Sequence, residues 1–253
     1  MAAPKQPKAP KKLTLSPTRL SDYMRCPRFY WFLYHKKYRR RPHGALSLGA
    51  TLHRSLESAH APDRPSLEEL LARFQSSWSG AGFASAEEER TQREAGAAML
   101  QQYYEEAPPP EEAPETILRE KMLKMDRGFY VLQGRIDRLD QWPDGTLDIV
   151  DYKSGRSGVT EEQVRGDVGL MVYETLVRHH FPLQPVRVAI HALRPNLRAT
   201  VERTDEERAA VVEFLDGVAR AIADEEAWRG VSNPDRCVGC DFERFCPDWR
   251  GTP

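Results

Sequence analysis

The sequence predicts an α/β fold in which a helical lobe precedes the sheet. Three observations predict it. Apolar residues recur at helical spacing in the first half of the chain. Three strand-like segments follow a proline-rich connector. A helix and two more strands then lead into a long amphipathic helix. Helices, a meander and alternating elements fit an α/β core with a helical insertion ahead of it.

The first half is predicted as a tail followed by helices. Residues 1–13 are rich in Pro, Lys and Ala and are expected to be a disordered basic tail. Ser16 and Pro17 resemble an N-cap and a first-turn proline. The helix that they start is interrupted at Cys26-Pro27 and continues to Tyr38. Further helices are predicted at 45–60, 66–78 and 86–106, and 107–115 is the connector.

The second half is predicted to hold the sheet. The Gly-containing turns before Phe129 and Thr146 separate the first three strands. The expected elements are strands 116–125, 129–140 and 146–153, helix 160–181, strands 186–193 and 198–203, and helix 205–228.

The length of 253 residues allows one large domain or one domain with an appended lobe. We expect a single domain over 14–253. Its parts are a helical lobe at 14–115, an α/β catalytic core at 116–204, and a C-terminal helix with a Cys-bearing tail at 205–253.

Composition and charge restrict the class of protein. The chain is 40% hydrophobic and 30% charged, with a net charge of −1, so it is not a generic polyanion binder. No apolar run approaches the ~20 residues that span a bilayer, and the start lacks the apolar core of a secretory signal. We therefore expect a cytoplasmic protein without a membrane partner. The dense basic run Lys36–Arg41 suits a phosphate backbone, although such a run is more often a solvated helix end.

Asp137, Asp151 and Lys153 form the central constellation. Two antiparallel strands joined by a short turn bring the ends that carry them together, and side chains 151 and 153 share one face. The two carboxylates and the backbone carbonyl of Tyr152 offer hard oxygen ligands to Mg²⁺ or Mn²⁺. Lys153 would hold or deprotonate a water, or stabilise negative charge on a phosphate. Alone, the triplet is more often a set of solvated hairpin charges, but here the acids lie in apolar strands, where unpaired charge is costly.

The residues around this constellation resemble a known family. Gly134–Asp140, followed by Asp151–Gly155, is similar to the G-x-x-D-R-x-D … D-Y-K-[ST]-G core of the RecB-like PD-(D/E)XK nucleases. Leu15–Leu20 with Cys26–Tyr30 resembles that family's N-terminal motif, and Gly49–His53 its helical histidine motif. The resemblance runs from position 15 to 246 in the family's order. It implies a restriction-endonuclease-like core with a mixed central sheet, flanking helices and a helical lobe over the active site.

The same resemblance implies a metal-dependent DNA nuclease that prefers single strands or free ends. His53 would ligate the metal with Asp137 and Asp151, and Lys153 would be the catalytic lysine; His53 alone would more often be a partly buried helix histidine. Glu120 occupies a strand position where relatives often have a glutamate near the active site; the alternative is a charge at a strand edge. A lysine near a metal could also have a lowered pKa, which would favour a base role.

One departure from the family concerns the helix after the Asp-x-Lys strand. Relatives usually carry Gln-x-x-x-Tyr there, a motif that contacts substrate. Tyr173 is present, but the position four residues earlier is Gly169, and Gln163 lies too far upstream to substitute simply. Tyr173 would equally well be a core aromatic of an amphipathic helix. The half-lost motif raises doubt about substrate placement, not about the metal site.

Four cysteines form a second constellation. Cys237, Cys240 and Cys246 have the spacing C-x₂-C-x₅-C, and Cys26 lies far upstream. Soft thiolates favour Zn²⁺ or an iron–sulfur cluster, and the spacing alone does not choose between them. The four positions resemble those around the [4Fe–4S] cluster of AddB-type and CRISPR-associated adaptation exonucleases. The resemblance implies this cluster, with Zn²⁺ as the alternative, in a structural role that ties the two ends of the chain together.

Contacts with DNA are expected beside the N-terminal cysteine. Five aromatic residues between Phe29 and Tyr34 precede the basic run, and aromatic and basic residues together suit unpaired bases and phosphates. We expect Phe29, Trp31 and Phe32 to pack under the cysteines instead, and Arg39, Arg40 and Arg41 to contact DNA. Two alternatives remain: a DNA-binding or scaffolding module that cleaves poorly, and a subunit of CRISPR spacer acquisition with an integrase partner. The sequence contains no G-x-x-x-x-G-K-[ST] motif, so unwinding would need a separate helicase.

Overall fold

The computed structural model describes residues 12–109, 112–155, 158–231 and 233–249. Most of the predicted disordered tail, residues 1–11, lies outside this range. Leu13, predicted as the last residue of that tail, instead begins strand β1 (Leu13–Leu15), which pairs in parallel with β3. Leu15 is fully buried in the main core. Three residues are too few to show a strand period, which explains why the sequence did not predict β1.

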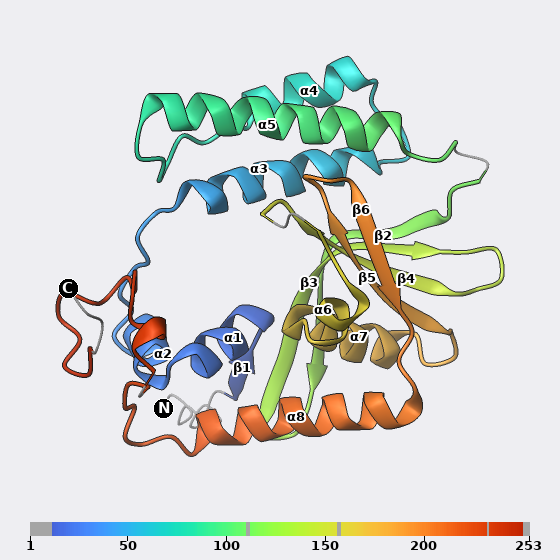
Figure 1. Ribbon diagram of the computed structural model, residues 1–253. Helices are drawn as coiled ribbons and strands as arrows, with labels where there is room; N and C mark the ends of the chain where they lie inside the picture. Colours follow the sequence, from blue (N-terminus) through green and yellow to red (C-terminus); the bar gives the residue numbers. More distant parts are fainter. Residues whose placement is uncertain (1–11, 110–111, 156–157, 232, 250–253) are drawn as a thin grey trace, which may run out of the picture.

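The described residues form a mixed sheet, as predicted, although it has six strands, β1 included, rather than the five predicted ones (Figure 1). The strand order is β1-β3-β4-β5-β6, with β2 also paired to β3. The β3–β4 and β5–β6 pairs are antiparallel, whereas β4–β5 is parallel. The strands are β2 (Glu115–Asp126), β3 (Tyr130–Gln141), β4 (Leu147–Lys153), β5 (Val186–Ala192) and β6 (Leu197–Val201).

Strand β3 is shared between three neighbours, and this arrangement opens the sheet. β2 pairs along one edge of β3 over nearly its whole length. On the other edge, β1 pairs with Tyr130–Leu132 and β4 with Arg138–Gln141. Within the described residues, no strand pairs with this edge at 133–137. Asp137 therefore lies where β4 and β1 diverge, beside an opening in the sheet rather than inside a closed ladder.

Helices cover the sheet in two groups. The helical lobe holds α3 (Gly44–Ala59), α4 (Leu67–Ser76) and α5 (Ala86–Glu105), while α7 (Val168–His180) and α8 (Asp205–Ala223) lie on the opposite side of the picture (Figure 1). The lobe has its own apolar core, which also includes Val150 and Tyr152 of β4. The strand that carries the predicted catalytic residues therefore contributes to both cores. No helix among the described residues is long and apolar enough to cross a membrane.

The predicted helix 160–181 is two helices, α6 (Glu161–Arg165) and α7. The break is at Gly166-Asp167, where the Asp167 carboxylate caps α7 by accepting a hydrogen bond from the Leu170 amide at 3.2 Å. Buried Arg203 stabilises the break, because it donates to the final carbonyls of α6, at Val164 and Arg165, and to Glu174 of α7.

Two other predicted helices are shorter than expected. The first stretch forms α1 (Pro17–Arg25) and α2 (Pro27–Tyr34), so it ends before Tyr38. Lys37 has φ 59°, a left-handed conformation that ends the helical run. α8 ends at Ala223 because the Glu225 carboxylate accepts from the backbone amides of Ala227 and Trp228 and forms a turn.

Candidate metal and substrate site

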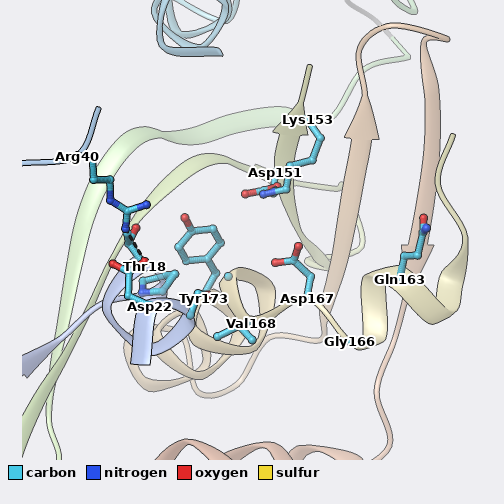
Figure 2. Close-up of a pocket in the computed structure, with 13 residues that line it drawn as sticks. Thr18, Asp22, Arg40, Asp151, Lys153, Gln163, Gly166, Asp167, Val168 and Tyr173 are labelled. Atoms are coloured by element: carbon cyan, nitrogen blue, oxygen red, sulfur yellow. Dashed lines mark hydrogen bonds and ion pairs between the residues drawn. The ribbon is translucent and has the colours of Figure 1, made fainter. Parts of the chain in front are cut away.

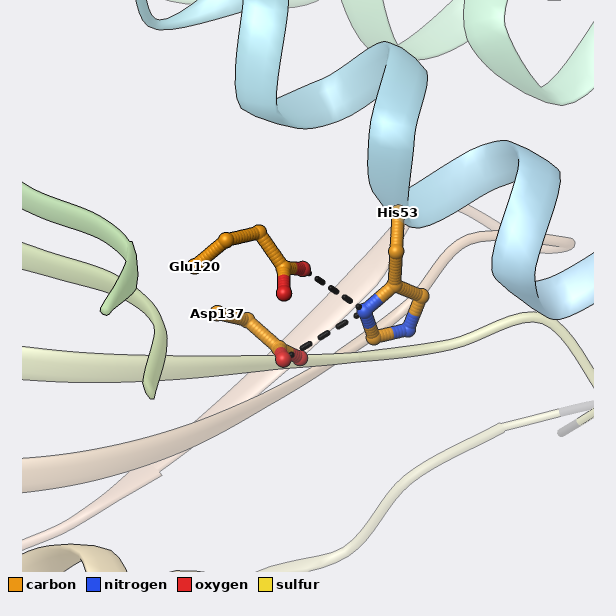
Figure 3. Close-up of side chains that lie close together, drawn as sticks. All are labelled: His53, Glu120 and Asp137. Atoms are coloured by element: carbon orange, nitrogen blue, oxygen red, sulfur yellow. Dashed lines mark ion pairs between the residues drawn. The ribbon is translucent and has the colours of Figure 1, made fainter. Parts of the chain in front are cut away.

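Three predicted site residues from three elements meet at the opening of the sheet (Figure 3). His53 of α3 places Nδ1 at 3.3 Å from Asp137 Oδ1 of β3 and at 3.4 Å from Glu120 Oε1 of β2. One possible ligand atom from each of the three residues lies within 4.8 Å of the others. A nitrogen and two carboxylates at this spacing form a donor set suitable for a divalent cation.

Glu120 reaches this cluster through an unusual backbone conformation. Its φ is 42°, in the left-handed region that a residue inside a strand rarely occupies. Such a conformation costs on the order of 1–3 kcal/mol and is concentrated at functional sites. Arg135 lies 3.7 Å from the other carboxylate oxygen of Glu120. The geometry therefore brings Glu120 into the cluster. From the sequence alone, a charge at a strand edge was an equally good explanation of this residue.

The backbone of Tyr152 connects this cluster to the next strand. Its amide donates to Asp137 Oδ2 at 3.1 Å, and its carbonyl oxygen lies 3.1 Å from His53 Nε2. On either side of it, Asp151 and Lys153 point to one face, and Lys153 Nζ lies 2.6 Å from Asp151 Oδ2. This bears out the shared face that the alternation of a strand predicts. Asp151 lies outside the three-residue cluster, on the pocket side of β4 (Figure 2).

The electrostatics of the site show a surplus of carboxylates. Burial, together with the charges of Asp137 and Asp167, raises the pKa of Asp151 to about 7 despite the opposing charge of Lys153. Burial lowers the pKa of His53, but its hydrogen bonds to Asp137 and Glu120 outweigh burial and raise the pKa to about 10. Asp151 Oδ2 is buried, and Lys153 Nζ at 2.6 Å is the cation that faces it. A bound cation would relieve this repulsion, so the residues fit a divalent metal.

The raised pKa of Lys153 argues against a role as a general base. Burial lowers the pKa of Lys153, but the charges of Asp151 and Asp167 outweigh burial, and the net shift is upward. A raised pKa keeps Lys153 protonated at neutral pH. The structure thus favours a lysine that stabilises negative charge over one that removes a proton.

A pocket of about 610 Å³ opens beside Asp151 and Lys153 (Figure 2). One wall is α1, with Thr18 and Asp22, and the opposite wall is the α6–α7 turn. Tyr173 of α7 lines the pocket and packs closely under β3, since a Cβ added at Gly134 would lie 2.9 Å from the Tyr173 ring. Tyr173 is therefore both a packing residue and a pocket residue.

The structure clarifies the departure at Gly169. Both Gly169 and Gln163 line the pocket. A Cβ added at Gly169 would lie 2.9 Å from Asp167 Oδ1, so Asp167 occupies the space that a longer side chain would need. Gln163 is exposed at the rim, and its Oε1 accepts from the Thr160 amide in a capping box. Asp167 was missed in the sequence; its position as an N-cap before Val168–Val172 was the available signal.

A buried polar network lies behind Tyr152, and the sequence gave no sign of it. The Arg138 side chain, 7% exposed, donates to the hydroxyl of Tyr152 at 2.8 Å and to that of Tyr103 at 2.5 Å. It also lies 2.6 Å from His60 Nε2, and its Nε is 2.9 Å from Asp140. The network holds the Tyr152 side chain, whose ring also meets the His53 ring edge to face at 6.0 Å, while the Tyr152 backbone contacts Asp137 and His53.

The three predicted DNA-binding arginines have different surroundings. Arg40 pairs with Asp22 and lines the pocket. Arg41 donates to the Cys240 carbonyl at 2.5 Å and pairs with Glu243 at 3.2 Å, so it contributes to holding the C-terminal tail. Arg39 is exposed.

The four cysteines line one cavity formed by both ends of the chain. Cys26 lies between α1 and α2, and the other three lie on the C-terminal tail. All four are free thiols. Phe29, Phe32 and Phe242 form a small apolar core against them, as predicted for Phe29 and Phe32. Burial raises the pKa of Cys240 and Cys246.

Comparison with known proteins establishes the family. The PD-(D/E)XK nuclease superfamily model matches residues 14–247. The chain belongs to this superfamily. The fold class and the general assignment as a nuclease are thereby confirmed. The group of His53, Glu120 and Asp137 could hold a metal ion, which agrees with the use of divalent metals in this superfamily.

Two solved structures are similar to this chain. One, from Eubacterium rectale, is described as a "putative exonuclease"; it is 14% identical, with a TM-score of 0.55, and the match covers 95% of this chain and 90% of the other. The second is SSO0001, 14% identical over 94% of this chain and 88% of the other, with a TM-score of 0.43. Likeness at this identity shows the fold alone. No curated protein matches.

Proposed function

We propose that this protein is a metal-dependent deoxyribonuclease that hydrolyses phosphodiester bonds. The observation that carries the proposal is the meeting of His53, Glu120 and Asp137 at the Tyr152 backbone, next to the Asp151–Lys153 pair that lines a pocket of about 610 Å³. A cation would offset the repulsion among these acids.

His53, Asp137, Asp151 and the Tyr152 carbonyl would hold Mg²⁺ or Mn²⁺, with Glu120 as a further neighbour. A bound metal of this kind polarises the scissile phosphate and lowers the pKa of a water. Lys153, kept protonated by Asp151, stabilises negative charge on the phosphate. Asp137 orients the Tyr152 backbone, and Tyr173 supports β3 from below.

We propose single strands or free ends of DNA as the substrate, with Arg39 and Arg40 as phosphate contacts at the pocket mouth. The description of the Eubacterium rectale structure as a "putative exonuclease" supports digestion from an end. The setting would be DNA repair and recombination or CRISPR adaptation, with a helicase or an integrase as the partner subunit.

We further propose that Cys26, Cys237, Cys240 and Cys246 hold a [4Fe–4S] cluster of the AddB or CRISPR-adaptation type. Four free thiols in one cavity, with apolar packing around them, fit a thiolate-bound centre; Zn²⁺ is the alternative. Anaerobically purified protein should be brown with broad visible absorbance. Colourless protein with stoichiometric zinc would select the alternative.

The experiment is a cleavage assay on end-labelled single- and double-stranded DNA with Mg²⁺, Mn²⁺ or EDTA. Wild type should cleave only with metal, and Lys153→Ala should not cleave. Lys124→Ala, an exposed lysine on β2, is the matched control and should behave like wild type. Absence of cleavage by folded, metal-supplied wild type would contradict the proposal.

The Gly169 position favours a second candidate, a nucleic-acid-binding or scaffolding module that cleaves poorly. Asp167 occupies the space in which the family's glutamine would lie. The binding-module hypothesis predicts that wild type and Lys153→Ala bind DNA equally well and that neither protein cleaves it. In that case Gly169→Gln, which must displace the Asp167 side chain, is the variant in which cleavage should appear.

A further inference from the structure

Two aromatic side chains from opposite ends of the chain form an exposed pair on the cysteine-bearing side. Tyr38 is 46% exposed and Phe245 is 55% exposed. Their rings meet edge to face at 5.5 Å. Both contact Phe32, which is itself buried against Phe242. We call Tyr38 and Phe245 the aromatic platform.

The platform is held by a rigid base. Phe32 stacks under Tyr38 at 5.7 Å with an interplanar angle of 14°, and the Tyr38 amide donates to the Phe32 carbonyl at 2.9 Å. Arg41 donates to the Cys240 carbonyl and thereby ties the Tyr38 segment to the tail that carries Phe245. Two large rings fixed in this way present apolar surface at little conformational cost.

The charge around the platform is positive. Lys36, Lys37, Arg39 and Arg244 are all exposed. No ion pair joins these four side chains to an acid within the described part of the chain. The nearby acids Asp241 and Glu243 both pair with Arg41, and Asp241 also contacts His43, so neither pairs with these four cations. The four cations therefore remain available to a polyanion.

The platform is also close to the catalytic pocket along the chain. Residues 35–43 connect α2 to α3 along the side of the molecule that carries the C-terminal tail (Figure 1). Arg40 of this segment lines the pocket with Asp151 and Lys153. Two residues span at most ~7 Å, so Tyr38 lies within that distance of Arg40 between Cα atoms.

We infer that the aromatic platform, with its four flanking cations, is a stacking surface for unpaired bases of a single nucleic-acid strand whose neighbouring part lies in the catalytic pocket. Every base has a face that stacks on an aromatic ring, while the cations neutralise phosphates without reading sequence. The inference rests on the proposed nuclease function and adds the route of the strand outside the pocket.

The test measures binding separately from cleavage. Fluorescence anisotropy in EDTA would give the Kd of wild type, Tyr38→Ala and Phe245→Ala for a labelled single strand of about twelve nucleotides, within the ~4–16 typical of such sites. Each substitution should weaken binding roughly fivefold or more, the low end of the range for base stacking. Tyr38→Phe should bind like wild type. Phe214→Ala, an aromatic on α8 that is 41% exposed, is the matched control and should change nothing.

An abasic strand of the same length isolates stacking. Wild type should bind it more weakly than the normal strand, and Tyr38→Ala should cause no further loss, because no base is left to stack. An equal loss from Tyr38→Ala on both strands would overturn the stacking assignment. Visible absorbance and thermal melting of each variant would show that the cysteine-bearing side remains folded.

Cleavage separates this inference from the proposed function. For a long strand, Tyr38→Ala should raise KM and leave kcat unchanged, because the stacked bases add binding without contacting the reacting phosphate. If wild type cleaves and the platform variants bind like wild type, the stacking inference is wrong and the nuclease proposal is supported. If wild type shows base-dependent binding that the platform variants lose, but no cleavage, the stacking inference is supported and the nuclease proposal is wrong.

Discussion

The metal site and the cysteine cavity are built in opposite ways. The residues of the candidate metal site lie on long strands and a helix, and buried hydrogen bonds hold both the side chain and the backbone of Tyr152 among them. The cysteine cavity is formed by a helix junction and by a tail with little regular structure. The first site is preorganised by the sheet. The second would depend on its bound centre to hold two chain ends together. Function and stability should therefore separate between the two regions.

The largest expected effect concerns the metal site. Lys153→Ala should reduce the rate of DNA cleavage by roughly 10²–10⁴-fold, because the charge that it places near the phosphate is lost. The melting temperature should fall only modestly, since Lys153 is partly exposed and Asp151, whose pKa is raised to about 7, can take up a proton when its partner is removed. Single-turnover cleavage and melting curves check both statements. A variant that unfolds would show that this lysine is structural.

A similarly large effect on stability is expected from Arg203→Ala. Arg203 and Glu174 are each 3% exposed and pair with one another, so removing the arginine leaves a buried carboxylate whose remaining partner is Arg178 at 3.2 Å. The free energy of unfolding should fall by about 3 kcal/mol, the low end for a broken buried pair, because Arg178 still balances part of the charge. Urea unfolding measures it. Arg165→Ala, which removes an exposed ion pair to Glu207 in the same region, should cost less than ~1 kcal/mol.

A substitution in the cysteine cavity should reduce stability and leave the cleavage rate nearly unchanged. Cys26→Ser should lower the melting temperature and expose both ends of the chain to protease together, because the proposed cluster would lose its ligand from the N-terminal side. Cleavage of a very short strand, measured below the new melting temperature, should stay close to wild type. If the rate falls as far as in Lys153→Ala, the two regions are not separable.

A smaller effect, on metal affinity, is expected from the polar network of Arg138 and Tyr152. Tyr152→Phe removes the hydroxyl that accepts from Arg138 and leaves the backbone groups that contact Asp137 and His53. Groups that position ligands typically change metal affinity about 10- to 100-fold. We expect the Mn²⁺ concentration for half-maximal cleavage to rise within that range. Tyr104→Phe, on α5, is the control.

The smallest effect on the free energy of unfolding is expected from Asp216, on α8. Burial raises the pKa of Asp216 on α8, but hydrogen bonds from Arg127 and Tyr130 outweigh it and bring the pKa below the ordinary 3.8. A lowered acid pKa contributes stability above pH 3.8 that is lost as the pH falls through the folded-state pKa. Asp216→Asn should cost about 1 kcal/mol at pH 7, discounted for partial exposure, and almost nothing at strongly acidic pH. Urea unfolding at both pH values checks the sign.

The two regions also differ in what their sequence could predict. Period-two alternation located β2 to β5 and the shared face of Asp151 and Lys153, because a strand's pattern fixes which way its side chains point. The break at Gly166-Asp167 was not predicted although Asp167 is a local N-cap signal, and the left-handed Glu120 was not predicted because its partners are distant in sequence. The Arg138 network was invisible for the same reason: nothing local pairs Arg138 with Tyr103. For the cysteines, spacing indicated a chelating set but not its occupant.

Calorimetric titration of Mn²⁺ tests the central claim, that the sheet preorganises a hard-ligand metal site independent of the cysteines. Wild type and Cys26→Ser should each bind Mn²⁺ at this site with similar affinity, and Asp137→Ala should abolish that binding in both. Failure of wild type to bind Mn²⁺, or loss of binding in Cys26→Ser while the core remains folded, would contradict the account.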